Sequence, residues 1–335
     1  MKITVDAFGG DNAPLAVIEG AVLAKKEYDV DIVLSGDAEK IKECAEENGL
    51  DISDMEIANA PCVIEMEDDP MMIIKEKSDC SMAVGMRHLA DGESDAFVSA
   101  GSTAALVVGG SMIVKRIRGV KRASLATVIP CENGYYMLMD SGANAQCRPE
   151  MLMQFAVMGS LYMKNIFGID NPRVGLLNIG TEETKGRELE LETYALLKGS
   201  DLNFVGNVEA REVPLGACDV VITDGFTGNV LLKTTEGLAK FFSHKLKDMM
   251  LSGISSKIGA MFLLKEIKSF KKSMDYTEVG GAPLLGTRKP VIKAHGSSNA
   301  NAFKNAIRQA NEIAKNSVVE KMTDALSKVK GEANE

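Results

Sequence analysis

Short apolar runs alternate with segments of helical periodicity along most of the chain. The apolar runs are rich in β-branched residues, as is typical of strands, and they cover residues 3–5, 32–35, 55–58, 96–99, 124–129, 136–140, 173–178, 203–206, 220–223 and 290–293. Between many of them, apolar residues recur every three or four positions, which predicts helices over 15–26, 38–47, 151–167 and 189–197. Strands separated by helices predict a mainly parallel sheet covered on both faces.

Two segments depart from this alternation. Residues 124–129 and 136–140 are joined through a short turn at 131–133, which predicts a hairpin and therefore a mixed sheet. Residues 235–276 form a continuous helical pattern with a weak point near Gly253, too long for an ordinary crossover. We therefore expect one α/β domain over residues 1–330, a helical excursion at 235–276 and a polar tail at 331–335.

Composition and charge exclude several classes of protein. The net charge of -9 argues against a protein that coats nucleic acid. Asp6 interrupts the apolar stretch that a signal peptide would need. Residues 96–114 carry no charge, but glycine, serine and threonine dilute them, so we expect buried elements and not a membrane span. The six cysteines form no C-x-x-C pair, which favours reduced thiols in the cytoplasm.

Polar or glycine-containing turns follow five of the predicted strands, at residues 6–11, 99–103, 178–182, 224–229 and 295–299. Glycine lets the backbone approach a ligand, and N–H groups at a helix start favour anions. Ser, Thr and Asn also cap helices, so each turn has a structural explanation as well. Because ligands bind at the carboxyl ends of parallel strands, we expect the five turns to form an anion site on one sheet edge. None matches a dinucleotide or nucleoside triphosphate motif.

Three side chains in or near these turns are candidates for polar chemistry. His295 is the one histidine of three that lies just after a strand and just before a helix, although a hydrogen-bonded turn residue is the alternative. Lys185 either binds an anion or is an ordinary surface lysine. Asp224 ends a strand, where it either caps a helix or assists proton transfer. No spacing of potential ligands predicts a metal, and no cofactor is indicated.

Two basic segments are candidates for binding surfaces. The first holds five cations and no acid, which either attract an acidic partner or form a solvated helix end; they are Lys115, Arg116, Arg118, Lys121 and Arg122. The second, residues 245–272, has seven lysines and two acidic residues, with apolar residues at intervals of four. Basic amphipathic helices of this kind lie on anionic membranes or pack between subunits. We expect membrane contact through Met250, Ile254, Ile258 and Phe262.

Nine short motifs occur in order between residue 2 and about residue 310: DAFGGDNAP, SAGSTAAL, MDSGAN, RPEMLMQFAVMGS, LNIGTEETKG, GNVEAR, DGFTGN, GGAPLLG and KAHGSSNANAF. Together they resemble the phosphate acyltransferase family PlsX of bacterial phospholipid synthesis. The resemblance implies transfer of an acyl group from acyl carrier protein to inorganic phosphate, with no cofactor. It also implies a three-layer α/β/α sandwich with a mainly parallel, mixed sheet, related to phosphotransacetylases and isocitrate-type dehydrogenases.

The resemblance also implies partners and a location. It favours a homodimer in the cytoplasm, peripherally associated with the inner face of the cell membrane. There the product would reach a downstream membrane glycerol-3-phosphate acyltransferase. Three alternatives remain open on the residues alone: a phosphotransacetylase-like enzyme that uses acyl-CoA, a decarboxylating dehydrogenase of related fold, and a membrane-associated scaffold without activity.

Acyl transfer to phosphate assigns roles to the polar turns. The phosphate must be bound and oriented, and the developing oxyanion must be stabilised. We expect Lys185 to hold phosphate, Asn229 to serve the oxyanion, and His295 and Asp224 to assist proton transfer. The other residues expected to bind phosphate or the acyl group are Gly9, Gly10, Gly101, Ser102, Thr103, Asn178, Gly180, Thr181, Gly228, Gly296, Ser297 and Ser298.

Overall fold

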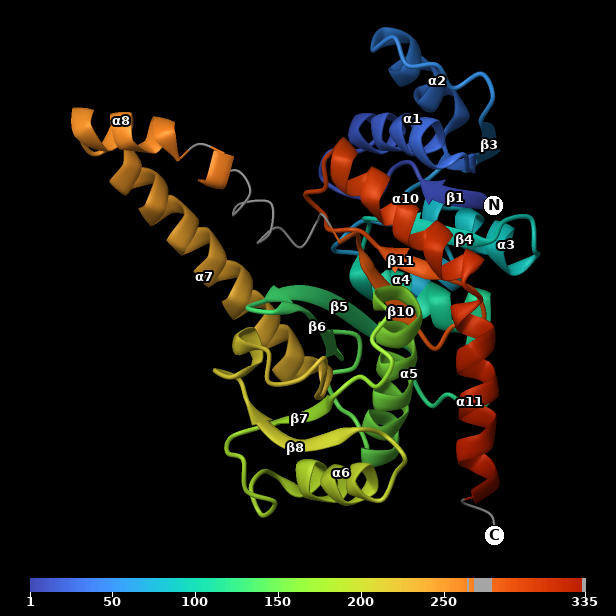
Figure 1. The fold of residues 1–335 in the computed structure, drawn as a ribbon. Coiled ribbons are helices and arrows are strands. Elements are labelled where there is room, and N and C mark those ends of the chain that lie inside the picture. Colours follow the sequence, from blue (N-terminus) through green and yellow to red (C-terminus); the bar gives the residue numbers. More distant parts are fainter. Residues whose placement is uncertain (264, 268–278, 333–335) are drawn as a thin grey trace.

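One mixed sheet of eleven strands forms the centre of the computed structural model, which describes residues 1–263, 265–267 and 279–332 (Figure 1). The strand order is β3-β2-β1-β4-β11-β10-β5-β6-β9-β7-β8. The strands are β1 (Lys2–Asp6), β2 (Asp31–Gly36), β3 (Glu56–Asn59), β4 (Ala96–Ser99), β5 (Ser124–Cys131), β6 (Gly134–Met139), β7 (Val174–Asn178), β8 (Phe204–Glu209), β9 (Val220–Ile222), β10 (Ala282–Leu285) and β11 (Val291–Lys293). All ten predicted strands are confirmed, with small shifts at their ends.

Helices cover both faces of this sheet. Right-handed crossovers place α1 and α3 on opposite faces, because the chain moves from β1 to β2 in one direction and from β3 to β4 in the other. On the α1 side, α10 packs against α1 and against β4 and β11. The main helices are α1 (Leu15–Tyr28), α2 (Ala38–Glu47), α3 (Ser81–Ala90), α4 (Thr103–Gly109), α5 (Pro149–Phe167), α6 (Glu188–Lys198), α7 (Gly225–Leu251), α8 (Ile254–Phe262), α10 (Ala300–Lys315) and α11 (Val318–Glu332). The predicted mixed α/β architecture is confirmed.

The strands change direction in the middle of the sheet. β10 runs antiparallel to β11, β5 antiparallel to β10, and β6 antiparallel to β5 in the predicted hairpin. After these three reversals, β6, β7, β8 and β9 are parallel to one another but run opposite to β1, β4 and β11. The expectation that all five polar turns share one sheet edge is therefore wrong. The turns after β1, β4 and β11 lie at one edge, and those after β7 and β9 leave from the other.

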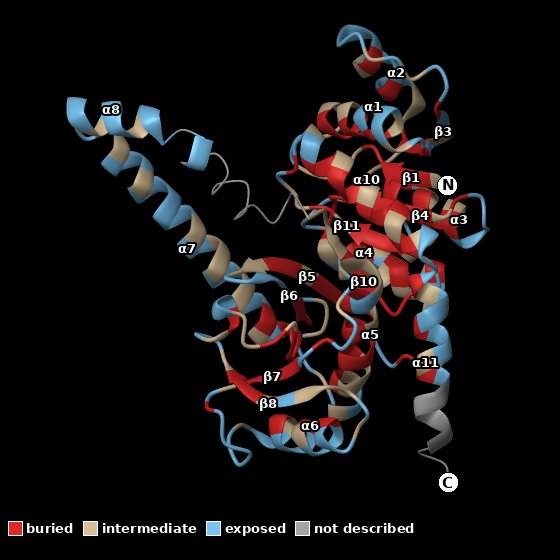
Figure 2. Ribbon diagram, in the orientation of Figure 1, coloured by how far each residue is buried: buried red, intermediate tan, exposed pale blue. Residues whose placement is uncertain are grey.

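The helical excursion begins earlier than the sequence predicted. α7 starts at Gly225 instead of residue 235 and ends at Leu251, and a break at Ser252 and Gly253 separates it from α8. Figure 1 shows α7 projecting from the body, with α8 at its outer end. Figure 2 shows that α8 and the outer part of α7 present exposed or partly exposed residues. The part of the predicted excursion at 264 and 268–276 lies outside the described residues.

The packed core lies on both sides of the sheet, and the strands are its most deeply buried part (Figure 2). Met side chains fill several central positions, among them Met82, Met86, Met137 and Met139, all nearly inaccessible to solvent. Because methionine is flexible, it fits irregular spaces that aromatic residues would otherwise occupy. In the part of the chain that the structure describes, no helix combines the length and the apolar character needed to cross a bilayer.

Candidate active site

A cavity of about 390 Å³ lies beside the strands at which the sheet changes direction. Its wall includes residues of β5, the start of β10, the end of β11 and the inner turns of α7. Apolar residues such as Leu125, Val128 and Leu232 share this wall with polar and charged ones. The cavity therefore offers both a place for charge and a surface for an aliphatic group.

The turn after β11 supplies the histidine of this cavity. The backbone N–H of Ser297 donates to Nδ1 of His295 at 3.2 Å, and the Ser297 hydroxyl lies 2.9 Å from the same nitrogen. Since a backbone N–H only donates, Nδ1 is an acceptor, and the neutral ring carries its proton on Nε2. Burial lowers the pKa of His295 below its usual value. At neutral pH the ring is therefore a hydrogen-bond donor through Nε2–H and carries no charge.

Contacts from the turn after β1 hold this histidine turn in place. The backbone N–H of Asp11 donates to the Gly296 carbonyl oxygen at 2.8 Å, and the Asn12 amide donates to the Ser298 carbonyl oxygen at 3.1 Å. Gly10 adopts φ +105°, and a Cβ there would lie 2.9 Å from the Gly296 carbonyl oxygen. The two glycines after β1 therefore leave room for the turns after β4 and β11 to pack closely against the turn after β1.

The loop after β6 forms the opposite side of the cavity. Asp140, which is fully buried, accepts hydrogen bonds from the backbone N–H groups of Gly142, Ala143 and Asn144 at 2.7–3.0 Å. The first turn of α7 packs on this loop so closely that a Cβ at Gly228 would lie 1.9 Å from the Asp140 carbonyl oxygen. This packing brings Asn229 to the cavity wall, next to Gly142.

Two lysines give the cavity its positive charge. Lys293 is the last residue of β11, and Lys233 lies one helical turn after Asn229 on α7. Lys233 forms an ion pair with Glu236 at 2.9 Å. Burial lowers the pKa of Lys293 to about 8, against the opposing influence of Asp6 and Asp11. An anion that enters the cavity would meet these cations together with the His295 and Asn229 donors.

Several of the expected site residues lie in the wall of this cavity. They are Thr103, Asn229, His295, Gly296 and Ser298. Others lie behind the wall and support it. Ser102 caps α4. A Cβ at Gly9 or Gly101 would lie 2.7 Å from a neighbouring atom, closer than van der Waals contact allows. Gly9, Gly10, Gly101 and Gly228 are therefore packing residues of the loops, whereas Gly296 has no side-chain or backbone atom closer than 3.6 Å to its Cβ position.

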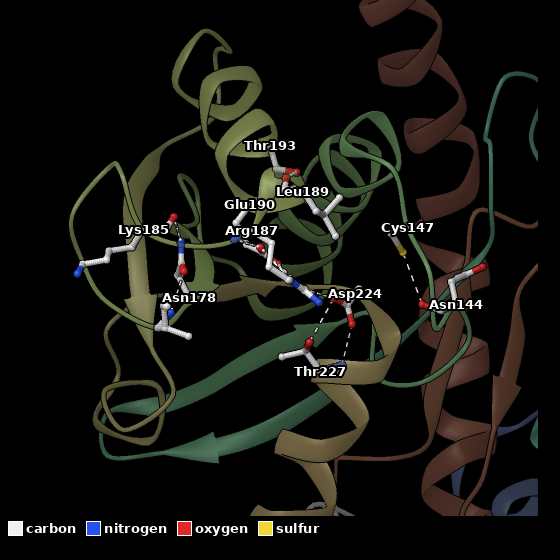
Figure 3. A network of polar contacts seen from close by, with 11 residues as sticks. Asn144, Cys147, Asn178, Lys185, Arg187, Leu189, Glu190, Thr193, Asp224 and Thr227 are labelled. Carbon is white, nitrogen blue, oxygen red and sulfur yellow. Dashed lines mark hydrogen bonds and ion pairs between the residues drawn. The ribbon is translucent and has the colours of Figure 1, made fainter.

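The turn after β7 lies outside the wall of the cavity, together with its expected phosphate-binding residues Asn178, Gly180, Thr181 and Lys185. The Asn178 side chain donates to the Lys185 carbonyl oxygen at 2.9 Å, which closes the turn on itself. In Figure 3 the Lys185 side chain points away from Arg187 and Asp224. A Cβ at Gly180 would lie 2.8 Å from the Glu182 carboxylate, so this glycine also serves local packing.

Asp224 takes the structural alternative that the sequence left open. Its carboxylate caps α7 by accepting the Thr227 N–H at 2.7 Å and pairs with Arg187 at 2.6 Å (Figure 3). Arg187 also binds Glu190, so one guanidinium joins two carboxylates that are almost fully buried. This ion-pair network fixes the start of α7, and Asp224 is not in the cavity wall.

Comparisons with known proteins agree with this geometry. Residues 1–321 match the model of a family described as fatty acid synthesis protein. The chain is 46% identical to a phosphate acyltransferase of Alkaliphilus oremlandii over 98% of both chains. It is 44% identical to a phosphate acyltransferase of Clostridioides difficile over 98% of this chain and 97% of the relative. The chain belongs to the phosphate acyltransferase family.

Solved structures show the same fold at lower sequence identity. The acyltransferase fold resembles a phosphotransacetylase from Streptococcus pyogenes, with a TM-score of 0.64 and 20% identity over 96% of this chain and 94% of that one. A phosphotransacetylase from Staphylococcus aureus gives a TM-score of 0.60 and 17% identity, over 94% of both chains. These likenesses support the predicted relation to phosphotransacetylases at the level of the fold.

Sequence analysis missed three charged residues of the cavity wall, Lys293, Lys233 and Glu236, and also Asn12, which supports the histidine turn. Lys293 had a usable signal, because it ends an otherwise apolar strand just before the histidine turn. Lys233 precedes the segment 235–276 that was predicted to be helical and Glu236 lies at its start, and the sequence did not show that this part of α7 reaches the cavity. Within the described residues, no group of three or more His, Cys, Asp or Glu side chains is arranged to hold a metal ion.

Proposed function

We propose that this enzyme transfers a fatty acyl group from acyl carrier protein to inorganic phosphate, forming acyl phosphate for phospholipid synthesis. The observation that carries the proposal is one cavity whose wall contains Lys233 and Lys293 together with His295 and Asn229. Cations suit a phosphate, and neutral donors suit the oxyanion of a thioester under attack. Membership of the phosphate acyltransferase family supports the choice of acceptor.

The reaction needs no covalent enzyme intermediate. A phosphate oxygen attacks the thioester carbonyl carbon and forms a tetrahedral intermediate with a negatively charged oxygen. The carbon–sulfur bond then breaks, the carrier leaves as a thiolate that takes up a proton, and acyl phosphate remains. Because the nucleophile is already an anion and the leaving group is good, the enzyme has to position the reactants and stabilise charge.

His295 acts in this scheme as a neutral hydrogen-bond donor. A histidine with a lowered pKa has no proton to give at neutral pH except the one on Nε2, which is a very weak acid. That N–H is suited to the developing oxyanion, together with the side-chain amide of Asn229. The expected role of His295 in proton transfer is therefore replaced by oxyanion stabilisation, and the thiolate takes its proton from solvent.

The basic segment at 115–122 is proposed to receive the acidic carrier protein. Lys115, Arg118, Lys121 and Arg122 are exposed, and Arg116 is partly exposed. Arg288, distant in the sequence, adds a further cation, because its Nε donates to the Arg116 carbonyl oxygen at 3.2 Å. Complementary charge of this kind increases association rates and selects partners.

A second cavity, of about 270 Å³, lies between this basic surface and the active site. Arg122, Ala143 and Asn144 line it, and the preceding residues Ser141 and Gly142 line the active-site cavity. The helix α4, which starts at Thr103 in the cavity wall, continues through a π-helical turn at Gly110–Lys115 to the basic surface. This arrangement supports entry of the prosthetic arm of the carrier along the 141–144 loop.

The outer end of α7 and α8 is proposed to contact the inner face of the cell membrane, a second subunit, or both. Ile254 and Phe262 are more than 80% exposed, Ile258 is half exposed, and Met250 is partly buried. Lys257 and Lys265 add positive charge beside them. Exposed apolar side chains flanked by lysines suit an anionic lipid surface, where the product would reach a membrane glycerol-3-phosphate acyltransferase.

Trapping of the product tests the proposed reaction. The purified protein is incubated with phosphate and either acyl carrier protein loaded with a fatty acid or the matching acyl-CoA, and acyl phosphate is captured with hydroxylamine. We expect hydroxamate from the carrier thioester and little from acyl-CoA. The reverse preference would favour a phosphotransacetylase-like enzyme, and no hydroxamate from either donor would favour a scaffold.

Liposome flotation tests the proposed membrane contact. Replacing both Ile254 and Phe262 with Glu places two charges among the exposed apolar residues and should abolish binding to anionic vesicles. A variant with Lys26→Glu on α1 controls for the change in net charge. Unchanged flotation of the double variant would contradict membrane contact, and a change from dimer to monomer without loss of flotation would assign these residues to the subunit interface.

A further inference from the structure

Lys293 lies in the wall of the cavity, beside the strands at which the sheet changes direction. It ends β11, next to Ser99 of parallel β4 and opposite Ala282 of antiparallel β10. Two residues later His295 begins the turn that supplies the proposed oxyanion donor. The side chain therefore lies on a strand, among backbone segments that hydrogen bonds keep fixed, and not on a loose loop.

Backbone carbonyl groups hold the Lys293 ammonium group at the cavity. Nζ donates to the Ala100 carbonyl oxygen at 3.1 Å and to the Ala294 carbonyl oxygen at 2.5 Å. An ammonium group has three N–H donors, so these two bonds leave one for a ligand. Within the described residues, no carboxylate forms an ion pair with Lys293.

Lys293 and Lys233, the two lysines of the cavity, differ in how their charge is compensated. Lys233 pairs with Glu236 at 2.9 Å, and its side chain is 55% exposed, so much of its charge is already compensated. Burial of Lys293 disfavours its charged form and lowers its pKa to about 8. The groups that act on its charge from neighbouring segments are Asp6 of β1, Asp11 of the following turn and Lys233 of α7. A cation kept in such surroundings without a bonded carboxylate is suited to an incoming anion.

We propose that Lys293 is the principal phosphate-binding cation of the active site, and that the carbonyl groups of Ala100 and Ala294 aim its ammonium group at the ligand. This assignment rests on the proposed function for the identity of the anion. It places the nucleophile at the end of β11, beside the His295 and Asn229 donors. It also replaces Lys185, which lies outside the cavity wall, as the expected phosphate ligand.

Binding of inorganic phosphate alone, measured by isothermal titration calorimetry, tests the assignment without any acyl donor. The proteins compared are the wild type, Lys293→Met, Lys293→Gln and the control Lys26→Met on the exposed face of α1. We expect both Lys293 variants to bind phosphate on the order of 10- to 100-fold more weakly, as for loss of a charge-assisted hydrogen bond. Lys26→Met should bind like the wild type.

Thermal melting shows whether each variant is folded. Glutamine keeps an N–H donor for a carbonyl oxygen, so Lys293→Gln remains informative if Lys293→Met unfolds. The pH profile gives a further readout that a structural lysine would not alter. Phosphate affinity of the wild type should fall above about pH 8, where Lys293 loses its proton, and this decrease should be absent in Lys293→Gln.

Equal phosphate affinity in the wild type and both variants would overturn the assignment, as would a wild type that binds no phosphate. The hydroxamate assay separates this result from failure of the proposed function. Loss of phosphate binding in the variants, with no hydroxamate from the wild type, would contradict acyl transfer and keep the anion site. Hydroxamate formation with the same KM for phosphate in Lys293→Gln and wild type would contradict only the role of Lys293.

Discussion

The turns at the two edges of the sheet have similar sequences but different surroundings. The turns after β1, β4 and β11 contact one another through backbone hydrogen bonds, such as that from Asp11 to Gly296, and leave His295 and Lys293 facing a cavity. In the turn after β7, Asn178 donates to the Lys185 carbonyl oxygen, and in the turn after β9, Asp224 pairs with Arg187, although Asn229 of that turn lines the cavity. The same residue types thus line the cavity at some positions, such as Ser298 and Asn229, and stabilise the fold at others, such as Gly9 and Asp224.

Strand direction brings one group of these turns together, which local sequence does not reveal. Three parallel strands, β1, β4 and β11, deliver their turns to the same place, so the polar groups of these turns gather there. β6, β7 and β9 run the other way; the loop after β6 and the first turns of α7 still bring Ser141, Asn229 and Lys233 to the cavity, whereas the turn after β7 lies outside its wall. Each of the following substitutions tests whether a turn belongs to the ligand or to the fold.

Replacement of His295 should have the largest effect. Loss of one oxyanion donor typically lowers the rate by about 10²- to 10³-fold, so we expect that decrease in kcat/KM for His295→Ala in the hydroxamate assay. His295→Gln keeps a side-chain donor and should lose less. His244→Ala, on the exposed surface of α7, is the matched control. A decrease of only a few-fold in His295→Ala would remove the histidine from the mechanism.

Gly10→Ala should come next, through displacement of the histidine turn. The new Cβ would lie 2.9 Å from the Gly296 carbonyl oxygen, and small displacements in an active site reduce rates roughly 10- to 100-fold. Gly92→Ala controls for backbone strain, because Gly92 also has positive φ (+84°) but no atom within 4 Å of its Cβ position. Equal kcat/KM in the two variants would show that the contact between the β1 and β11 turns is not needed for activity.

Arg187→Met should lower stability and leave the KM for phosphate unchanged. It leaves the nearly buried carboxylates of Glu190 and Asp224 without their common cation. Because the guanidinium is 62% exposed, we expect a modest loss of about 1–2 kcal/mol in the free energy of unfolding, measured with urea. Arg211→Met, which breaks an exposed pair with Glu209, should change stability less. A tenfold rise in KM for phosphate would place Arg187 in the active site.

Lys185→Ala should have the smallest effect, at most a few-fold in kcat/KM. Its side chain lies outside the cavity wall and points away from the ion-pair network. Lys198→Ala on α6 removes an exposed partner of Glu183 and is the control for loss of a surface charge. A hundredfold loss in Lys185→Ala alone would return the turn after β7 to the reaction and reverse the distinction between the two edges.

Local patterns in the sequence were enough to predict ten of the strands and the mixed character of the sheet. β10 was missed because it is short and contains Pro283, which disfavours a strand within a sheet. The start of α7 was missed because Gly225 and Gly228 weaken helix propensity, although close packing against the 140–144 loop requires them. In both places, contacts distant in sequence override the local preference.

The candidate site was predicted in part. His295, Asn229, Thr103, Gly296 and Ser298 line the cavity, and strand-end position was sufficient to find them. Lys293 was overlooked although it has the same kind of position, because it was taken as the end of a strand. The separation of the β7 turn from this group depends on the direction of β10 and β5, which pairing between distant segments determines.

α7 also fixes how far a product must travel. From Glu236 in the cavity wall to Leu251 at the outer end, the helix rises about 22 Å at 1.5 Å per residue. One acyl chain spans only about 15 Å, half of the hydrocarbon core of a bilayer. If the outer end of α7 contacts a membrane, an acyl phosphate held in the cavity is too short to reach the lipid along this helix. Under the proposed function and membrane contact, the product would then leave the cavity before its tail enters the bilayer, or pass directly to another protein.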